Sequence, residues 1–369
     1  MQYKILHVVS TLGYGGVSKF ILNYYNNIEH SKVKFDFISH GIQEDFHEDL
    51  LKTGSKIFYT KTIKESSVFS YIKKGIKIIR ENGPYHAIHI HTDYQAGIYA
   101  SIARLAGIKI RICHSHRIDA PNKIGDKLLP FFKLLISKNA THLVASSKKA
   151  GTFLFGDKDF KVLNNAIDLD DYSPISVEEI CELKRSLGIE NEWDGIIIGH
   201  VGTFTDVKNQ FFFIPLMEEL KKRNIDFKII FVGEGLQKDK FKNQVHLGGH
   251  TENVVFTGIR SDVPKLMQLL DVFVLPSKYE GLGIVTIEAQ SCNIPCVVSD
   301  TVPIETDMGL NLIQYLSLQK HVSKWVNAIL NVITDNKEKN FNFIKKKITE
   351  NGYNIKVESK KLLDLYRIF

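Results

Sequence analysis

Long apolar runs are missing from this sequence of 369 residues. None approaches the roughly 20 residues that a helix needs to cross a bilayer, which argues against a membrane-spanning protein. The first residues, MQYKILHVVS, enter a strand pattern directly, without a charged leader and an apolar core, so a signal peptide is not expected. The sequence predicts a cytoplasmic protein, attached at most to the inner face of the cell membrane.

Cysteine is also scarce, and charge of one sign is never concentrated. The four cysteines form no C-x-x-C pair, which indicates reduced thiols. The net charge of +7 is spread along the chain, and basic residues form no stripe with interleaved aromatics, so a nucleic-acid-binding protein is disfavoured. A mild positive excess is still compatible with an anionic partner such as a nucleotide diphosphate or a phospholipid surface.

Short apolar runs do alternate with helical patterns along most of the chain. The first series of expected strands comprises Tyr3–Ser10, Lys34–Ser39, Lys56–Tyr59, Ala87–His91, Arg111–Ser115 and His142–Ser146. The second series comprises Gly195–Val201, Phe227–Gly233, Val254–Gly258, Val272–Pro276 and Pro295–Ser299. Helices are expected at Val17–Asn27, Ser66–Glu81, Tyr94–Leu105, Asn209–Arg223, Val263–Leu269 and Ile284–Ser291. This alternation predicts an α/β protein with parallel sheets that helices cover on both faces.

Two domains are predicted from this pattern. Residues 1–170 form a first Rossmann-like domain for the acceptor, and 195–354 a second one for the nucleotide-sugar. Residues 171–194 are acidic and polar, contain Pro174, and are expected to be a linker. The helical tail 355–369 is expected to pack back on the first domain. Ligands of such folds bind at the carboxyl ends of the strands, which predicts a cleft between the two domains.

The stretch DVFVLPSKYEGLGIVTIEAQSCNIPCVVSD, residues 271–300, carries the strongest chemical signal. A buried strand is followed by a polar turn, and the glycines Gly281 and Gly283 precede a helix. Free amides at a helix start bind anions such as phosphates. Glu288 lies four residues after Ile284 and therefore on the same helix face. A carboxylate in such an apolar helix needs hydrogen-bond partners, which the two hydroxyls of a ribose would supply.

A known family resembles this pattern. Glu280 and Glu288, with seven residues between them, resemble the E-x7-E element of retaining GT-B glycosyltransferases of family 4, the glycosyltransferase group 1 proteins of capsular and exopolysaccharide biosynthesis. Further motifs follow in the same order as in the family: the glycine loop STLGYGGV at 10–17, RICHSH at 111–116, VLNNAID at 162–168, HVG with KN at 200–209, FVGEG at 231–235 and FTG at 256–258. The resemblance covers nearly the whole chain.

The resemblance implies roles for individual residues. Glu288 would bind the ribose, Glu280 the donor sugar, and Lys208 would neutralise the departing diphosphate. His116 would lie beside the donor sugar, and Gly16 would bring its amide to the phosphates. The catalytic residues expected are therefore His116, Lys208 and Glu280. The expected nucleotide-sugar-binding residues are Gly15, Gly16, Thr203, Lys208, Gly233, Leu282, Gly283, Ile284 and Glu288.

The chain departs from the family pattern at two places. Thr203 stands where the family usually has an arginine, which removes one of two cations expected at the leaving diphosphate. Arg260 or Lys278 could substitute for it; otherwise catalysis is weakened. Asn164 and Ala166 also replace the family's proline and glycine.

Three other sequence patterns admit metal or cofactor binding. His89 and His91 alternate on one expected strand, as His114 and His116 do on the next, and such same-face spacing suits zinc. No cysteine or acidic partner has ligand spacing nearby, so no metal is expected. The glycine loop lacks the third glycine of a dinucleotide fingerprint, so NAD is not expected either. The D-x-D patterns at 157–159 and 168–170 are interpreted as solvated loops.

The segment Leu128–Ile136, LLPFFKLLI, is flanked by Lys123, Lys127 and Lys138 and contains Lys133. A basic amphipathic helix of this kind can lie on an anionic membrane. It can equally be a core helix with lysines that extend to water. The two interpretations stay open at the level of sequence.

The function predicted is transfer of a sugar from a nucleotide diphosphate, UDP first, to a glycan or polyprenyl-linked acceptor. By the resemblance the anomeric configuration is retained, with no metal or other cofactor. The first alternative is a UDP-sugar epimerase of the same fold. The second is a nucleotide-sugar-binding protein with weakened catalysis, which the threonine at Thr203 keeps open.

Overall fold

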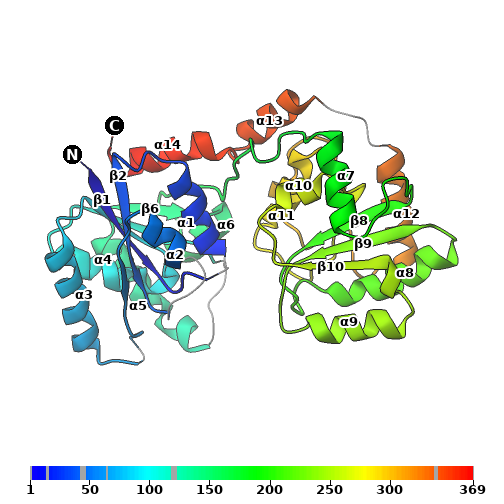
Figure 1. Ribbon diagram of the computed structural model, residues 1–369. Coiled ribbons are helices and arrows are strands. Elements are labelled where there is room, and N and C mark those ends of the chain that lie inside the picture. Colours follow the sequence, from blue (N-terminus) through cyan, green and yellow to red (C-terminus); the bar gives the residue numbers. More distant parts are fainter. Residues whose placement is uncertain are drawn as a thin grey trace. The chain divides into compact units, whose positions relative to one another are not determined.

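The computed structural model divides the chain into two compact units (Figure 1). The first unit comprises Met1–Ile167 together with Gly352–Phe369, and the second comprises Asp168–Asn351. The structure describes residues 2–13, 16–41, 47–63, 65–117, 123–335 and 340–368, and the side chains of 123–126 also lie outside this description. The boundaries at 167 and 352 lie three residues before the expected ends at 170 and 355.

Among its described residues, the first unit contains a sheet of seven strands in the order β3-β2-β1-β4-β5-β6-β7. The strands are β1 (Tyr3–Val9), β2 (Val33–Ser39), β3 (Ile57–Tyr59), β4 (Ala87–Ile90), β5 (Ile110–Ser115), β6 (His142–Ala145) and β7 (Lys161–Val162). Every pairing is parallel. The chain order reverses between β1 and β4, so the sheet is doubly wound and has its switch point there.

Helices cover both faces of this sheet. They are α1 (Gly16–Asn26), α2 (His47–Lys52), α3 (Val68–Asn82), η1 (Asp93–Gln95), α4 (Ala96–Leu105), α5 (Lys123–Asn139), α6 (Lys148–Phe155) and α14 (Ile355–Leu365). One core gathers residues of α1, α2 and α14, and the other gathers residues of α3, α4, α5 and α6. Because apolar side chains meet helices on both faces, strands such as β4 are buried along their whole length.

The second unit, within its described residues, contains a sheet of six strands in the order β10-β9-β8-β11-β12-β13. The strands are β8 (Ile196–Val201), β9 (Phe227–Val232), β10 (Val254–Gly258), β11 (Val272–Leu275), β12 (Cys296–Ser299) and β13 (Ile313–Leu316). All pairings are parallel. The order again reverses at the centre, between β8 and β11, which defines the switch point of the second sheet.

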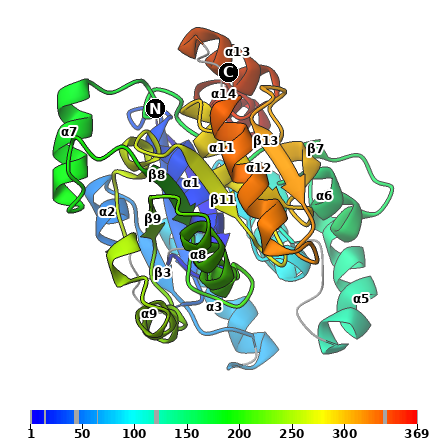
Figure 2. The same ribbon diagram turned by 90° about the vertical axis from the view of Figure 1, so that its right-hand side faces the viewer.

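The helices of the second unit also cover both faces of their sheet. They are α7 (Val177–Ser186), η2 (Gln210–Phe212), α8 (Phe213–Lys222), α9 (Lys238–Leu247), η3 (Thr251–Asn253), α10 (Val263–Met267), α11 (Ile284–Ser291), η4 (Ile304–Thr306), α12 (Val322–Thr334) and α13 (Phe341–Glu350). Helices α8 and α12 pack side by side (Figure 2), and the ring centres of Phe212, which precedes α8, and Trp325 of α12 lie 4.7 Å apart.

The stretch 171–194, expected to be a linker, contains the helix α7. Ser176 and Glu179 form a capping box at its start, each side chain accepting a backbone amide of the other residue. Ile180 and Leu183 of this helix pack on the core of the second unit. The acidic composition obscured the helical spacing of these apolar residues in the sequence. Because they pack on the core, α7 is part of the second unit and the prediction of a linker is wrong.

The chain returns to the first unit at its carboxyl end. Ile167 pairs with Asn354 in a parallel bridge, and α14 then packs against α1. Ile355, Leu362 and Tyr366 are buried in the same core as residues of β1. Among the described residues, none of the helices has the length and apolar character that crossing a bilayer requires.

Candidate functional site

The predicted residues of the second unit gather at the switch point of its sheet. The loop after β8 carries Thr203 and Lys208, and the loop after β11 carries Glu280 and the glycines before α11. Because β8 and β11 are neighbouring parallel strands, both loops leave the sheet at the same edge. Ligands of doubly wound sheets bind at this position.

Lys208 and Glu280 are brought together from loops 72 residues apart. Lys208 Nζ donates to Glu280 Oε1 at 2.6 Å, and Ser277 Oγ donates to the same oxygen at 2.6 Å. The Glu280 side chain is 8% exposed and that of Lys208 23%. A Cβ on Gly202 would lie 3.4 Å from Lys208 Cδ, at ordinary van der Waals distance, so the lysine stem runs directly over this glycine. Sequence reasoning missed Ser277, whose hydroxyl orients the carboxylate.

Helix α11 begins at this edge without a side-chain cap. Gly283 is its N-cap residue, with a left-handed φ of 77°, and has no side chain that could accept the first amides. Such amides have no partner within the helix, and the helix dipole adds a partial positive charge. A Cβ on Gly281 would meet nothing within 4 Å. The segment Leu282–Ile284 therefore offers an anion-binding helix start with open space before it.

Glu288 lies one turn further along α11 and is only 1% exposed. It shares a hydrogen bond with Tyr172, whose pKa is raised by burial and by the charge of Glu288. Burial and the same carboxylate also raise the pKa of the Cys292 thiol. Glu288 is therefore an inward-facing carboxylate and not a surface residue. Tyr172 was missed because it lies in the stretch interpreted as a linker.

Thr203 and Gly233 follow the neighbouring strands β8 and β9. Thr203 is exposed, and its carbonyl accepts a hydrogen bond from Gln210. Both basic residues considered as substitutes for the missing arginine are already in ion pairs. Arg260 makes two hydrogen bonds to Asp262, and Lys278 Nζ lies 2.8 Å from Asp206. Among the described residues, no hydrogen bond positions Arg260 or Lys278 beside Lys208.

Gly233 is sterically required. Its φ is 137°, and a Cβ there would lie 2.3 Å from the carbonyl oxygen of Gly202. We expect Gly233→Ala to lower the free energy of unfolding by about 2–4 kcal/mol, because backbone strain and a backbone clash add. Gly249→Ala is the matched control: it also has a positive φ, 66°, but open space around it, and should cost about 1 kcal/mol. Equal losses in chemical denaturation would contradict this account.

The predicted residues of the first unit lie at the ends of its central strands. Gly15 lies outside the described residues. Gly16 is the first residue of α1 and is exposed, and a Cβ there would meet nothing within 4 Å. His116 directly follows β5, and its backbone amide donates to Asp93 at 2.8 Å. Gly16 follows β1 at the switch point of the first sheet, and His116 follows β5, the next strand beyond β4.

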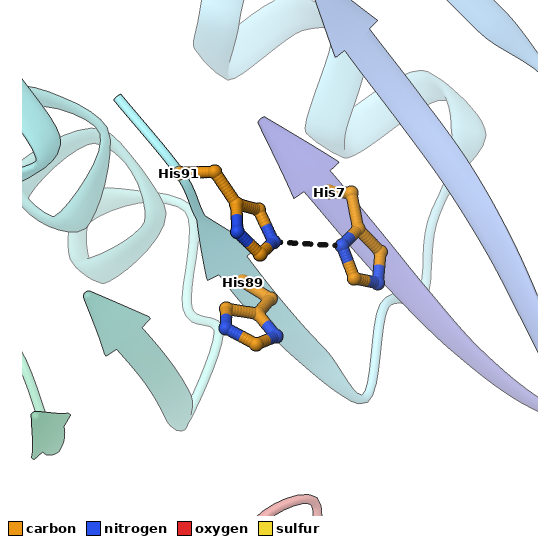
Figure 3. Close-up of side chains that lie close together, drawn as sticks. All are labelled: His7, His89 and His91. Atoms are coloured by element: carbon orange, nitrogen blue, oxygen red, sulfur yellow. Dashed lines mark hydrogen bonds between the residues drawn. The ribbon is translucent and has the colours of Figure 1, made fainter. Parts of the chain in front are cut away.

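Five histidines lie on one face of β1, β4 and β5 and just beyond the ends of β4 and β5. They are His7, His89, His91, His114 and His116. Figure 3 shows His7 and His91 joined through ring nitrogens at 3.1 Å, with His89 beside them. In two overlapping groups of three the ring nitrogens lie within 4.8 Å of one another, His7 with His89 and His91, and His91 with His114 and His116.

Three neutral imidazoles are a ligand set that zinc or copper accepts. These rings do stay neutral, because burial holds the pKa of His7 at about 3 and lowers the pKa of His89, His91 and His114. Neither group contains a carboxylate or thiolate to offset a divalent charge. The ring nitrogens also bind one another, and a metal would have to displace those hydrogen bonds.

Buried neutral histidines make stability depend on pH. In the second unit, burial lowers the pKa of His200 to about 4. An unfolded histidine takes up a proton below about pH 6.5, so each such ring lowers the free energy of unfolding by up to about 1.4 kcal/mol per pH unit. We expect the melting temperature to fall steadily from about pH 6.5 toward pH 4. Calorimetry measures the melting temperature as a function of pH. The control variant His246→Gln, which replaces an exposed histidine, should show the same slope as the wild-type protein. A melting temperature of the wild-type protein that does not change with pH would contradict the expectation.

Comparisons with known proteins identify the family and the fold of the chain. Residues 185–350 match the model of the family described as glycosyl transferases group 1. The EpsF protein of Bacillus subtilis, named as a glycosyltransferase, is 36% identical over 378 residues, covering 100% of this chain and 97% of EpsF. An Escherichia coli enzyme named UDP-Gal:alpha-D-GlcNAc-diphosphoundecaprenol alpha-1,3-galactosyltransferase is 25% identical over 387 residues, covering 99% of this chain and 97% of that enzyme.

Among solved structures, Anabaena Alr3699/HepE in complex with UDP superimposes with a TM-score of 0.79 and 18% identity, over 100% of both chains. Two doubly wound parallel sheets in one chain, matched over their full length, define the GT-B fold. The chain belongs to the glycosyl transferases group 1 family and is a glycosyltransferase. The expected fold and enzyme class are confirmed.

Proposed function

We propose that this glycosyltransferase moves a sugar from a UDP-sugar to a glycan or lipid-linked glycan acceptor during surface polysaccharide synthesis, with retention of the anomeric configuration and without a metal. The observation that carries the proposal is the pairing of Lys208 with Glu280 beside the uncapped start of α11. A cation, free amides and a buried carboxylate at one strand edge suit a diphosphate joined to polyhydroxylated groups.

Each residue has a distinct proposed role. Glu288 accepts hydrogen bonds from the ribose hydroxyls, for which its hydrogen bond with Tyr172 orients it. The amides of Leu282–Ile284 hold the diphosphate. Lys208 turns from Glu280 to the phosphates, and Glu280 then accepts from hydroxyls of the donor sugar. In the absence of donor the ion pair keeps both side chains near their working positions.

The reaction follows from these roles. The bond between the anomeric carbon and the β-phosphate oxygen breaks, and the acceptor hydroxyl forms a new bond to that carbon on the same face. UDP departs with the bonding electrons, and the proton of the acceptor hydroxyl passes to an oxygen of the departing β-phosphate. Lys208 and the helix start stabilise the charge that grows on the leaving diphosphate. Because this chain supplies a cation and amide donors itself, no metal is required in the proposal.

UDP is the proposed nucleotide because HepE was solved with UDP and the Escherichia coli relative is named for UDP-galactose. The same relative is named for a diphosphoundecaprenol-linked acceptor, and EpsF and a Staphylococcus aureus capsular biosynthesis protein are further relatives. These names support a polyprenyl-diphosphate-linked sugar as acceptor.

The test is a transfer assay with radiolabelled UDP-glucose, UDP-galactose and their N-acetyl forms, each with an undecaprenyl-diphosphate-linked sugar. We expect one donor to label the lipid fraction, without added divalent cations and in the presence of EDTA. Interconversion of free UDP-sugars without acceptor would instead identify an epimerase. UDP-sugar binding without either product, and no gain from Thr203→Arg, would identify a protein with weakened catalysis.

Helix α5 suits the proposed lipid-linked acceptor. Phe132 and Ile136 are buried in the core, but Leu128, Phe131 and Leu134 are 46–57% exposed. Exposed Lys127 and Lys138 flank this apolar face, and Lys133 Nζ lies 5.6 Å from the centre of the Phe153 ring. One face of the helix is therefore part of the core, and the other presents apolar side chains between lysines. We propose that the exposed face contacts the anionic inner surface of the cell membrane.

Vesicle sedimentation tests the membrane proposal. The wild-type protein should bind phosphatidylglycerol vesicles more than phosphatidylcholine vesicles, and salt should weaken the binding. The double variant Phe131→Ser with Leu134→Ser should lose most of it. Phe69→Ser is the matched control, because Phe69 is 77% exposed on α3. Equal binding by the double variant and the control would contradict a role for α5.

A further inference from the structure

Five histidines and Tyr366 make one unbranched series of contacts in the first unit. His116 Nε2 lies 2.9 Å from His91 Nδ1, and His91 Nε2 lies 3.1 Å from His7 Nδ1 (Figure 3). His7 Nε2 lies 3.4 Å from the Tyr366 hydroxyl, which lies 2.8 Å from His89 Nδ1. His89 Nε2 then lies 3.1 Å from His114 Nδ1. Each ring between the two ends uses both of its nitrogens.

We propose that this histidine chain, formed by His7, His89, His91, His114, His116 and Tyr366, holds His116 as a neutral ring whose Nδ1–H donates to an oxygen of the substrate. His116 is then a fixed hydrogen-bond donor and not a general base. The choice of a sugar or phosphate oxygen as acceptor rests on the proposed function, but the state of the ring does not.

Counting protons limits the chain to two arrangements. A neutral imidazole has one donor and one acceptor nitrogen, and a tyrosine hydroxyl supplies one proton. Six groups therefore bring six protons to five contacts. Each contact needs one proton. The sixth could stay on the Tyr366 hydroxyl only if His7 and His89 both donated to its oxygen, and this would leave an unpaired O–H in the buried core. The sixth proton therefore lies at one end, on His116 Nδ1 or on His114 Nε2. All donors in the chain then point in the same direction.

The buried end selects between these arrangements. His114 is fully buried, and its Nε2 has no hydrogen-bond partner among the described residues. Burying an unpaired N–H donor is rarer, and hence less favourable, than leaving an acceptor unpaired. His114 Nε2 therefore stays bare, which places the sixth proton on His116 Nδ1 at the partly exposed strand end. The Nε2 lone pair of His116 is occupied by the donor from His91.

The surroundings keep the chain neutral. The Phe20 ring of α1 lies edge-on to His114 and His116, at 5.0 and 5.5 Å between ring centres. Asp93 on η1 accepts the backbone amide of His116, and Arg117 follows His116 in sequence. To protonate His116, a proton would have to displace the donor of His91. The chain therefore opposes titration of His116 in the physiological range.

The direct test is NMR of the full chain with nitrogen-15-labelled histidine, in the absence of any nucleotide. The His116 signals are assigned by difference with His116→Gln. We expect a neutral ring protonated at Nδ1 that does not change between about pH 8 and about pH 5. A ring protonated at Nε2, or one that titrates in this range, would overturn the proposal. Ligand-field absorption bands on titration with cobalt(II) would also overturn it, because a bound metal would replace the hydrogen bonds of the histidine chain.

Paired variants at His91 separate positioning from packing. His91→Leu removes the donor to His116 Nε2, so His116 should regain an ordinary titration. His91→Asn keeps an amide N–H near the position of Nδ1 and should restore the fixed ring. In the transfer assay, the pH profile of kcat/KM should show an inflection near the ordinary histidine pKa of about 6.5 for His91→Leu, and no such inflection for His91→Asn. If the NMR result holds but no transfer occurs with any donor, the proposed function fails and the histidine chain stands.

Discussion

Replacing Lys208 by alanine is expected to lower kcat by about 100- to 1,000-fold, the usual effect of removing one group that stabilises transition-state charge. The KM for the donor should rise much less. Lys208 is the cation held at the switch point, 2.6 Å from Glu280, and Thr203 supplies no second charge. Steady-state transfer assays at saturating donor measure the effect.

Lys278→Ala is the matched control for Lys208. Lys278 lies on the neighbouring loop and pairs with Asp206, but both side chains are half-exposed or more, and such pairs contribute little. We expect Lys278→Ala to retain nearly full kcat. Similar losses in the two variants would show that general positive charge matters and that Lys208 has no specific role. Thr203→Arg in the wild-type background should raise kcat if a second cation fits.

Replacing Glu288 by glutamine is expected to weaken UDP binding by roughly 10- to 100-fold, because hydrogen bonds to a charged acceptor contribute about 1.5–3 kcal/mol. The glutamine keeps the shape of the side chain and can still bind Tyr172, so the fold should persist. Isothermal titration with UDP measures the change. Binding of inorganic diphosphate should fall much less, because the carboxylate is proposed to contact the ribose alone.

Glu358→Gln is the control for the general effect of replacing a buried carboxylate by an amide. Glu358 is also 1% exposed, but it lies on α14 in the first unit, where Lys361 donates to it. Its pKa is raised, chiefly by burial. The variant should alter the melting temperature and leave UDP affinity unchanged. If Glu358→Gln lowered UDP affinity as much as Glu288→Gln, both losses would be attributed to reduced stability and not to a contact with the ribose.

Local sequence information was sufficient to predict the strand and the helix that carry the candidate site in the second unit. The apolar run of β11, the glycines after it and the apolar spacing of α11 each report on their own residues, and the helix Ile284–Ser291 has the predicted bounds. Glu288 was predicted from its position on the helix, whereas the role of Glu280 was predicted from the resemblance. The partnership of Lys208 with Glu280 needed the resemblance, since 72 residues separate them.

Features that depend on distant contacts were missed. Helix α7 was hidden because its exposed face is acidic and only a few residues, such as Ile180, face the core. Tyr172 acquires its importance only by folding onto Glu288, 116 residues later. The histidine spacings on β4 and β5 were visible, but the chain is completed by His7 and Tyr366 from opposite ends of the sequence.

Hydrogen–deuterium exchange of the full chain with and without UDP tests most directly whether the nucleotide binds where β8 and β11 end. The first amides of α11 lack intrahelical partners and should exchange quickly in the free protein. With saturating UDP, we predict slower exchange in peptides covering 202–208 and 281–288. Unchanged exchange in both segments at saturation, or protection confined to other parts of the chain, would contradict the assignment.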